Sequence, residues 1–400
     1  MPNMISLKQY PSNFRQLILG RSTLNIGDSL YLIAFSFALV EVYHVSEMQL
    51  ALITLIGRLP LLLSFLYGGY INQLNNKKAW LIRTQWLHVF SIIFVIVAYL
   101  SEASLIIICL LNASFYLINN VQNTLNSTIV PLSLNNDLSL INKSIDIQYL
   151  TSNVLDIASN FLASLLLIVL AYHTVMGISL PIILLGIYFY TKLTINNQPI
   201  SQESRQGFSS QLKTGIHYFF SKKDTSLIIV IESFLSGATD LLLTLAPIYL
   251  LDINLSLESI GVVFALQRGA DFLGALYAPR INMRPKHFFY VDYLVSGLML
   301  VLVFVIDNVW IKMICYFIAF FVIGISGNIF EKMIYESYEP DKLAGIYTII
   351  SSLFSFFGVA FLLVPSVYSN IHVLGIGLNS LTIIFGLVIF IKLKMKNKFI

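Results

Sequence analysis

Charged side chains interrupt several apolar segments of this 400-residue chain, and they are its first candidates for chemistry. They are Asp28, Arg58, Asp156, Glu232, Asp240, Arg268 and Asp271. A charge at the centre of a membrane helix costs about 2.5–3.5 kcal/mol on insertion scales, so such residues are rare and usually functional. A carboxylate can release and regain a proton as its surroundings alternate between wet and dry, whereas a guanidinium stays charged. The four acids Asp28, Asp156, Glu232 and Asp240 are therefore candidate proton carriers.

The remaining charges, Arg58, Arg268 and Asp271, fit a structural or gating role better. Arg268 and Asp271 are spaced i, i+3 and can partly neutralise each other on one helix face. Arg58 and Asp28 come from consecutive antiparallel segments and can pair across them. The alternative is that all these charges form structural ion pairs between helices.

Uncharged polar residues recur at helical intervals beside these charges. One segment carries a stripe of amides spaced three and four residues apart, and other segments carry shorter stripes. The residues that we expect to line a polar cavity are Asn25, Asn112, Tyr116, Asn119, Asn123, Asn126, Ser236, Asn328, Glu331 and Tyr335. Amides also join neighbouring membrane helices, at about 0.6 kcal/mol each on average, which is the alternative explanation for the stripe.

The elements that must position these residues are membrane helices. Hydrophobic residues make up 57% of the chain and charged residues 11%, against about 25% charged in typical soluble proteins. Segments of roughly 20 apolar residues recur twelve times, centred near residues 30, 60, 90, 115, 157, 183, 238, 268, 297, 321, 354 and 382. The fold class is therefore an all-α membrane protein with twelve transmembrane helices.

Several other classes of site are not indicated. The two cysteines, Cys109 and Cys315, lie in apolar segments and suit buried positions, and the six histidines are scattered without metal-ligand spacing. The sequence has no phosphate-binding glycine loop with a Lys-Ser/Thr end, so we expect no ATP site. We expect no metal, no cofactor, no nucleic-acid partner and no enzymatic activity.

The basic residues predict the orientation. With the N-terminus inside, all Lys and Arg fall in inner loops and tails except Arg58, Arg268 and Lys312. By the positive-inside rule, both termini are cytoplasmic. The longest polar stretch, residues 195–224, divides the chain into six-helix bundles at 1–194 and 225–400. We expect this linker to contain a short amphipathic helix at the membrane surface, with Phe219 and Phe220 on its apolar side.

The two predicted bundles share a short sequence pattern. "GRLPLLLSFLYGGYIN" (57–72) and "QRGADFLGALYAPRIN" (267–282) match at a shift of 210 residues, pairing Arg58 with Arg268 and Tyr67 with Tyr277. Such parallel six-helix repeats are typical of one large transporter architecture. The chain resembles the major facilitator superfamily over nearly its whole length. "GGYINQLNNKK" corresponds to that family's cytoplasmic loop signature, but Asn72 and Gln73 replace its Asp-Arg pair, which weakens the charge latch attributed to this loop.

Within that superfamily, "NFRQLILGRSTLNIGDSLY" and "QLKTGIHYFFSKKDTSLIIVI" resemble the macrolide-efflux subgroup. The resemblance implies a multi-pass, monomeric secondary transporter of the cytoplasmic membrane that exports a small organic solute in exchange for protons. A drug-like compound and an amino-acid-derived metallophore of the staphylopine kind both fit the polar cavity. Two alternatives stay open: a proton-symporting importer of a polar solute, and a transport-inactive membrane sensor or scaffold.

Overall fold

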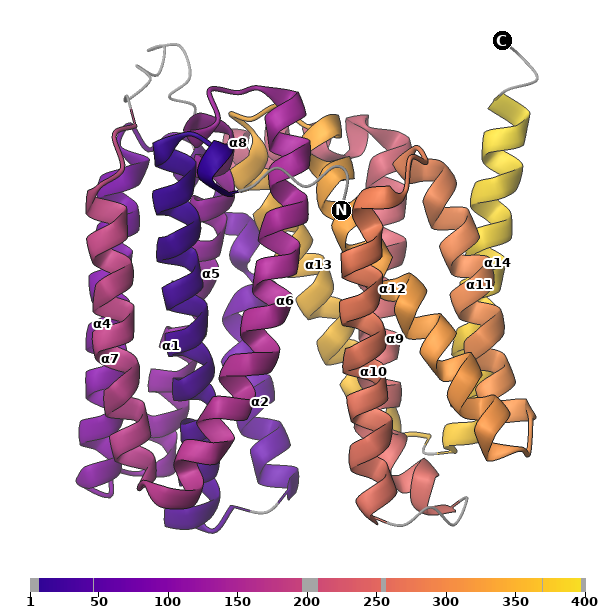
Figure 1. The fold of residues 1–400 in the computed structure, drawn as a ribbon, viewed down its shortest axis with the longest axis horizontal. Helices are drawn as coiled ribbons and strands as arrows, with labels where there is room; N and C mark the ends of the chain where they lie inside the picture. The colour runs from indigo at the N-terminus through magenta and orange to yellow at the C-terminus, as the bar shows by residue number, and fades with distance from the viewer. Residues whose placement is uncertain (1–6, 46, 196–207, 253–256, 369, 397–400) are drawn as a thin grey trace. The chain divides into compact units, whose positions relative to one another are not determined.

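The computed structural model describes residues 7–45, 47–195, 208–252, 257–368 and 370–396, which form helices and short connections (Figure 1). Contacts divide the chain into two compact units. We call residues 5–219 with 338–355 the N-terminal unit, and residues 220–337 with 356–400 the C-terminal unit. The predicted boundaries at 194 and 225 stay a prediction.

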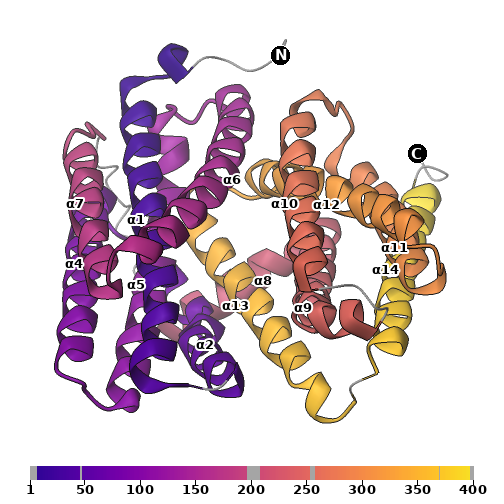
Figure 2. The same cartoon turned by 60° about the horizontal axis from the view of Figure 1, so that its bottom comes forward.

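The N-terminal unit contains the helices from α1 to α7 and nearly all of α8. They are α1 (Ser12–Tyr43), α2 (Glu47–Leu62), α3 (Gly68–Asn72), α4 (Lys77–Leu100), α5 (Leu105–Ser133), α6 (Leu138–Val169), α7 (Tyr172–Thr191) and α8 (Phe208–Ser221). A 3-10 turn, η2 (Ser64–Leu66), joins α2 to α3. Within this unit α1 packs against α7 and α6, and α5 packs against α4 and α2. In both views α1 runs between α7 and α6 (Figures 1 and 2).

The C-terminal unit contains α9 (Lys223–Asp252), α10 (Leu257–Tyr277), α11 (Pro285–Val305), α12 (Val309–Ser337) and α14 (Ile371–Lys396). Helix α13 (Leu343–Leu362) belongs to both units, because its residues up to 355 pack with the N-terminal unit and the rest with the C-terminal one. Helices α10 and α12 approach very closely, since a Cβ on Gly324 would lie 2.3 Å from the Asp271 carbonyl oxygen. Glycine is required there by space, not by backbone conformation.

Ten of the described helices are long and apolar enough to cross a membrane, so the structure is that of a multi-pass membrane protein. They are α1, α4, α5, α6, α7, α9, α11, α12, α13 and α14. The other two long helices are α2, with 16 residues, and α10, which carries Arg268 and Asp271. All twelve segment centres expected from the sequence fall within a helix, and the count of twelve spans stays a prediction.

Side-chain caps define two of the loop-to-helix junctions. The Asn76 side chain accepts a hydrogen bond from the Ala79 amide, 2.9 Å away, where α4 begins. Asp137 accepts bonds from two backbone amides, at 2.9 and 3.2 Å, where α6 begins. Caps matter here because the first turn of a helix has amide groups with no internal partner.

The predicted amphipathic helix of the linker corresponds to α8, while residues 196–207 of the linker lie outside the described residues. Phe219 is fully buried and its ring stacks on Tyr338, 6.1 Å between centroids, whereas Phe220 is 53% exposed. The two phenylalanines predicted on one apolar side therefore have different surroundings, because Phe219 packs inside the N-terminal unit. A position of α8 at the membrane surface stays a prediction.

Candidate functional site

The carboxylate of Asp28 on α1 has hydrogen-bond partners on two other helices of the N-terminal unit. Asn119 of α5 donates a hydrogen bond to one oxygen at 2.6 Å, and His88 Nε2 of α4 lies 2.8 Å from the other. His88 is fully buried and the Asp28 side chain is 12% exposed. Three helices thus converge on one carboxylate inside the bundle.

The two ring nitrogens of His88 have different surroundings. Nε2 lies beside Asp28, whereas Nδ1 is buried and makes no hydrogen bond to the described residues. Asn119 accepts a bond from Asn123 at 2.7 Å, which orients its amide with the nitrogen toward Asp28. Among the described residues, Asp28 is therefore held by an amide and an imidazole, with no lysine or arginine within ion-pair distance.

A chain of amides links this buried group to an accessible position. Asn123 is exposed and donates a hydrogen bond to Asn119, which is half-buried. Asn119 in turn donates to Asp28, which is buried. The residues of the predicted stripe on α5 therefore differ in their exposure. Its two ends, Asn112 and Asn126, are buried, at 2% and 0% exposure.

The end of the stripe near Asn112 and Tyr116 packs against α2. A Cβ on Gly57 would lie 2.8 Å from the Tyr116 ring and 2.9 Å from the Asn112 amide nitrogen. This half of the stripe thus contacts a neighbouring helix, which fits the alternative explanation that the amides join helices. Asn123, in contrast, is exposed.

A second set of polar contacts joins α1 to α6. Asn25 donates to Asp156 at 2.6 Å, and Arg21 donates to Gln148 at 2.9 Å. Asp156 is exposed, unlike Asp28. The sequence predicts Asn25 as a cavity-lining residue and Asp156 as a candidate proton carrier, and the structure brings the two side chains into direct contact.

In the C-terminal unit the predicted residues lie on α9 and α12. Ser236 and Asp240 are half-buried on α9, with Asp240 facing Gly358 of α13. On α12, Asn328 and Tyr335 are buried and Glu331 is half-buried. Both Asn328 amide atoms are enclosed without a hydrogen-bond partner among the described residues.

Glu232 of α9 lies within electrostatic reach of a carboxylate that the sequence reasoning did not single out, Asp292 of α11. Asp292 is 2% exposed. Two acids from different helices thus share the interior of the C-terminal unit, where like charges repel strongly.

Of the three predicted gating charges, the structure describes the side chains of two, Arg268 and Asp271. Arg268 is exposed, Asp271 is half-buried, and the two interact electrostatically along α10, as their spacing predicts. The backbone of Arg58 belongs to α2, but its side chain lies outside the described residues. A pair between Arg58 and Asp28 therefore stays a prediction.

Sequence reasoning missed His88, the closest partner of the leading acid. Metal-ligand spacing does not reveal His88, because no second ligand stands at such a distance from it in the sequence. Among the described residues no three His, Cys, Asp or Glu side chains gather to hold a metal. A usable signal was present, because His88 stands alone in the apolar run "WLHVFSIIFVIVAYL". A lone polar group in such a run needs a partner on another helix.

The loop after α2 contacts the first half of α13 through uncharged groups. The Asn72 side chain accepts a bond from the Ala344 amide at 2.9 Å, in the first turn of α13. Ser64 donates to the Thr348 carbonyl at 2.7 Å, and the hydroxyls of Ser64 and Ser352 lie 2.8 Å apart. Asn72, which replaces the acid of the family signature, thus satisfies a backbone amide at a helix N-terminus.

Comparisons with known proteins bear on this helical arrangement. No protein-family model matches the sequence, and no curated protein does. Solved structures do match. A bacterial homologue of the iron transporter ferroportin, in an outward-facing state, is 17% identical with a TM-score of 0.73, covering 95% of this chain and 98% of that one. The major facilitator superfamily transporter FucP, in the outward conformation, is 11% identical with a TM-score of 0.73, covering 94% and 97%.

This chain has the major facilitator fold. The human organic anion transporter MFSD10 agrees, at 13% identity and a TM-score of 0.71, with 94% of this chain and 99% of that one covered. At these identities the likeness shows the major facilitator fold alone, and the resemblance to the macrolide-efflux subgroup stays a prediction.

Proposed function

We propose that this chain is a proton-coupled secondary transporter that exports a small organic solute across the cytoplasmic membrane. In this proposal twelve helices span the membrane, both termini are cytoplasmic, and the protein acts as a monomer by alternating access. The cargo is a drug-like compound or an amino-acid-derived metallophore of the staphylopine kind. We propose no cofactor and no enzymatic step.

The observation that carries the proposal is the Asp28 group. In this proposal the carboxylate of Asp28, held by His88 and Asn119, takes up and releases one proton inside the bundle. The exposed Asn123 gives this group a polar connection to accessible space. A site that changes its net charge by one proton is what coupling requires, whereas a purely structural ion pair keeps its protons.

The membrane potential supplies enough energy for this coupling. One charge that crosses 100 mV provides about 2.3 kcal/mol, which supports a solute gradient of roughly tens-fold. No nucleotide-driven step is needed for a gradient of that size.

The amide-rich face of α5 and the acids of α9 and α11 support a polar cargo. Asn123 on α5 and Asp240 on α9 are accessible to different degrees, and their side chains offer both donors and acceptors. In the proposal each of these faces offers polar contacts to the solute, and Arg58, Arg268 and Asp271 take the gating role.

A proton-symporting importer is the second candidate, favoured by the fold comparisons. FucP is described as a fucose:proton symporter, and XylE, with a TM-score of 0.66 at 11% identity, as a proton:xylose symporter. The same Asp28 group would serve either direction, because proton binding does not by itself fix which way the solute moves.

Everted membrane vesicles separate these functions. Metabolites secreted by cells with and without the gene are compared first, and any compound that depends on the gene is then offered to vesicles. An exporter fills everted vesicles when their lumen is acidified, and Asp28→Asn abolishes that uptake while the exposed-loop control Asp307→Asn retains it. Uptake that is unchanged in Asp28→Asn would refute the coupling role, and solute efflux driven by the same gradient would favour the importer.

A further inference from the structure

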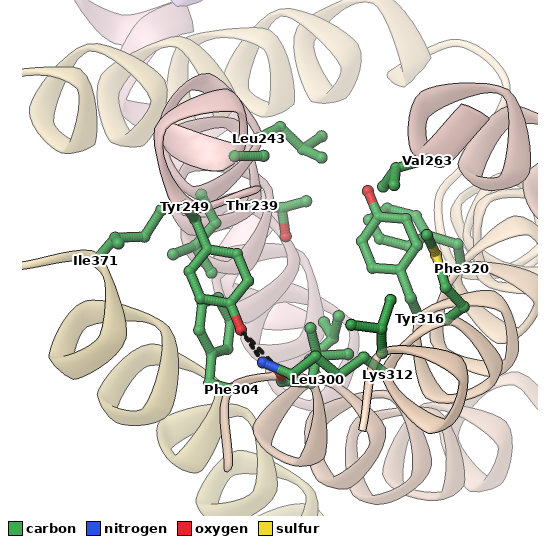
Figure 3. Close-up of a pocket in the computed structure, with 15 residues that line it drawn as sticks. Thr239, Leu243, Tyr249, Val263, Leu300, Phe304, Lys312, Tyr316, Phe320 and Ile371 are labelled. Atoms are coloured by element: carbon green, nitrogen blue, oxygen red, sulfur yellow. Dashed lines mark hydrogen bonds between the residues drawn. The ribbon is translucent and has the colours of Figure 1, made fainter. Parts of the chain in front are cut away.

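An apolar pocket lies inside the C-terminal unit, and none of the acids of α9 and α11 described above lines it. Helices α9, α10, α11 and α12 and the start of α14 line it, and its empty space, open mouth included, is about 750 Å³. Tyr249 and Tyr316 lie on opposite sides of the pocket (Figure 3). Leucine, valine and phenylalanine side chains make up most of the remaining wall. Pockets of a few hundred to a thousand Å³ hold small organic molecules.

One charged side chain, Lys312 of α12, lines this otherwise apolar pocket. Its amine donates a hydrogen bond to the Tyr249 hydroxyl at 2.6 Å and lies 5.1 Å from the centre of the Tyr249 ring (Figure 3). The Tyr249 hydroxyl in turn donates to the Val303 carbonyl at 3.0 Å. This relay fixes the amine against the wall of the pocket.

The orientation of Lys312 is not the one expected for its position. It is the fourth residue of α12, and a lysine so near a helix end normally extends its amine to water. Here the residue is only 8% exposed, because the side chain turns inward to Tyr249. Among the described residues no carboxylate lies within ion-pair distance of the amine, and its partners there are a phenol and an aromatic ring.

We infer that this pocket binds an amphipathic organic anion, a free carboxylate with an apolar body. An ammonium has three donor hydrogens, and only one of them is directed at Tyr249. The remaining donors and the uncompensated charge suit a carboxylate, and the leucine, valine and phenylalanine walls suit a hydrocarbon body. The site belongs to the C-terminal unit alone and does not depend on the proposed transport mechanism.

Binding to the purified full-length protein tests this inference without any transport assay. Octanoate, octanol and octylamine share one apolar body and differ in charge, and each is titrated by calorimetry into phosphatidylcholine nanodiscs, with empty nanodiscs subtracted. We expect octanoate to bind about tenfold more tightly than octanol, and octylamine more weakly than both. Equal binding of octanoate and octanol would overturn the inference.

Three variants assign the binding to this pocket. Lys312→Met should reduce octanoate binding to the level of octanol, while Lys286→Met, at a lysine paired with Asp224 outside the pocket, should leave it unchanged. If Lys312→Met does not fold, Leu243→Trp fills the pocket and should abolish octanoate binding with Lys312 in place. Unchanged octanoate binding in either pocket variant overturns the inference. Loss of octanoate binding in nanodiscs that contain phosphatidylglycerol would identify a lipid headgroup as the occupant instead, which also overturns it.

Discussion

The Asp28–His88 contact makes a quantitative prediction for a double-mutant cycle. His88→Phe removes the donor from one carboxylate oxygen but keeps a ring that can still pack on Phe115, whose centroid lies 4.6 Å from that of His88. A hydrogen bond to a charged group contributes about 1.5–3 kcal/mol, and the buried oxygen gains no water in exchange. We therefore expect His88→Phe to lower the free energy of unfolding by about 2–3 kcal/mol.

The second arm of the cycle is Asp28→Asn, and the double variant combines it with His88→Phe. Once Asp28 is uncharged, the loss of His88 should matter much less, so the two effects should fall short of additivity by about 2 kcal/mol, roughly a 30-fold change in the unfolding equilibrium. Unfolding of the purified protein in dodecyl sulfate, followed by circular dichroism, measures all four free energies. The exposed control Asp307→Asn should couple to neither residue.

A coupling energy below about 0.5 kcal/mol would refute the reasoning, because side chains that share no interaction have additive effects within that margin. The protonation itself is observed independently. Infrared difference spectra of the wild type should contain a carboxylic acid band that appears on acidification and that Asp28→Asn removes. A band unchanged in that variant would show that another acid takes the proton.

Three further outcomes follow from local contacts. Asn72→Ala should destabilise the first turn of α13 by about 1 kcal/mol, because it removes the acceptor for a backbone amide there, and hydrogen exchange of that turn should quicken roughly fivefold. Gly324→Val should unfold or strongly destabilise the C-terminal unit in a thermal melt, because its side chain would collide with the backbone of α10, whereas Gly177→Ala, with nothing within 4 Å, should leave the melting temperature unchanged. Asp292→Asn should stabilise the protein by about 1 kcal/mol in dodecyl sulfate unfolding, because it relieves repulsion with Glu232, and a destabilised variant would mean that the two acids already share a proton.

The helices themselves could be predicted from the sequence because the backbone has few options in a membrane. An apolar run of about 20 residues must satisfy its own amides and carbonyls, and a helix does so within one segment. The spacing of polar residues also predicted which of them share a face, as for Asn119 and Asn123 on α5. Those inferences depend only on local geometry.

The partners of each polar face could not be predicted in the same way. Neighbouring segments in sequence suggested Arg58 as the partner of Asp28, but α1 also meets α4 and α5, and these helices supply His88 and Asn119. The contact of α13 with Asn72 is formed by residues about 270 positions apart, so no periodicity reveals it. Which helices become neighbours is decided by packing of whole faces, which spacing along one segment does not encode.

Incomplete neutralisation is what the two candidate sites have in common. In the N-terminal unit, the described partners of Asp28 are an imidazole and an amide, with no lysine or arginine among them. In the C-terminal unit, Lys312 is held by a phenol, so a positive charge remains for an anion to cancel. A lysine or arginine beside Asp28, or an acid beside Lys312, would complete the charge of that site, and a small ion would then bind only by breaking an internal pair. The residues most informative about function are therefore the buried charges whose hydrogen bonds are satisfied but whose charge is not.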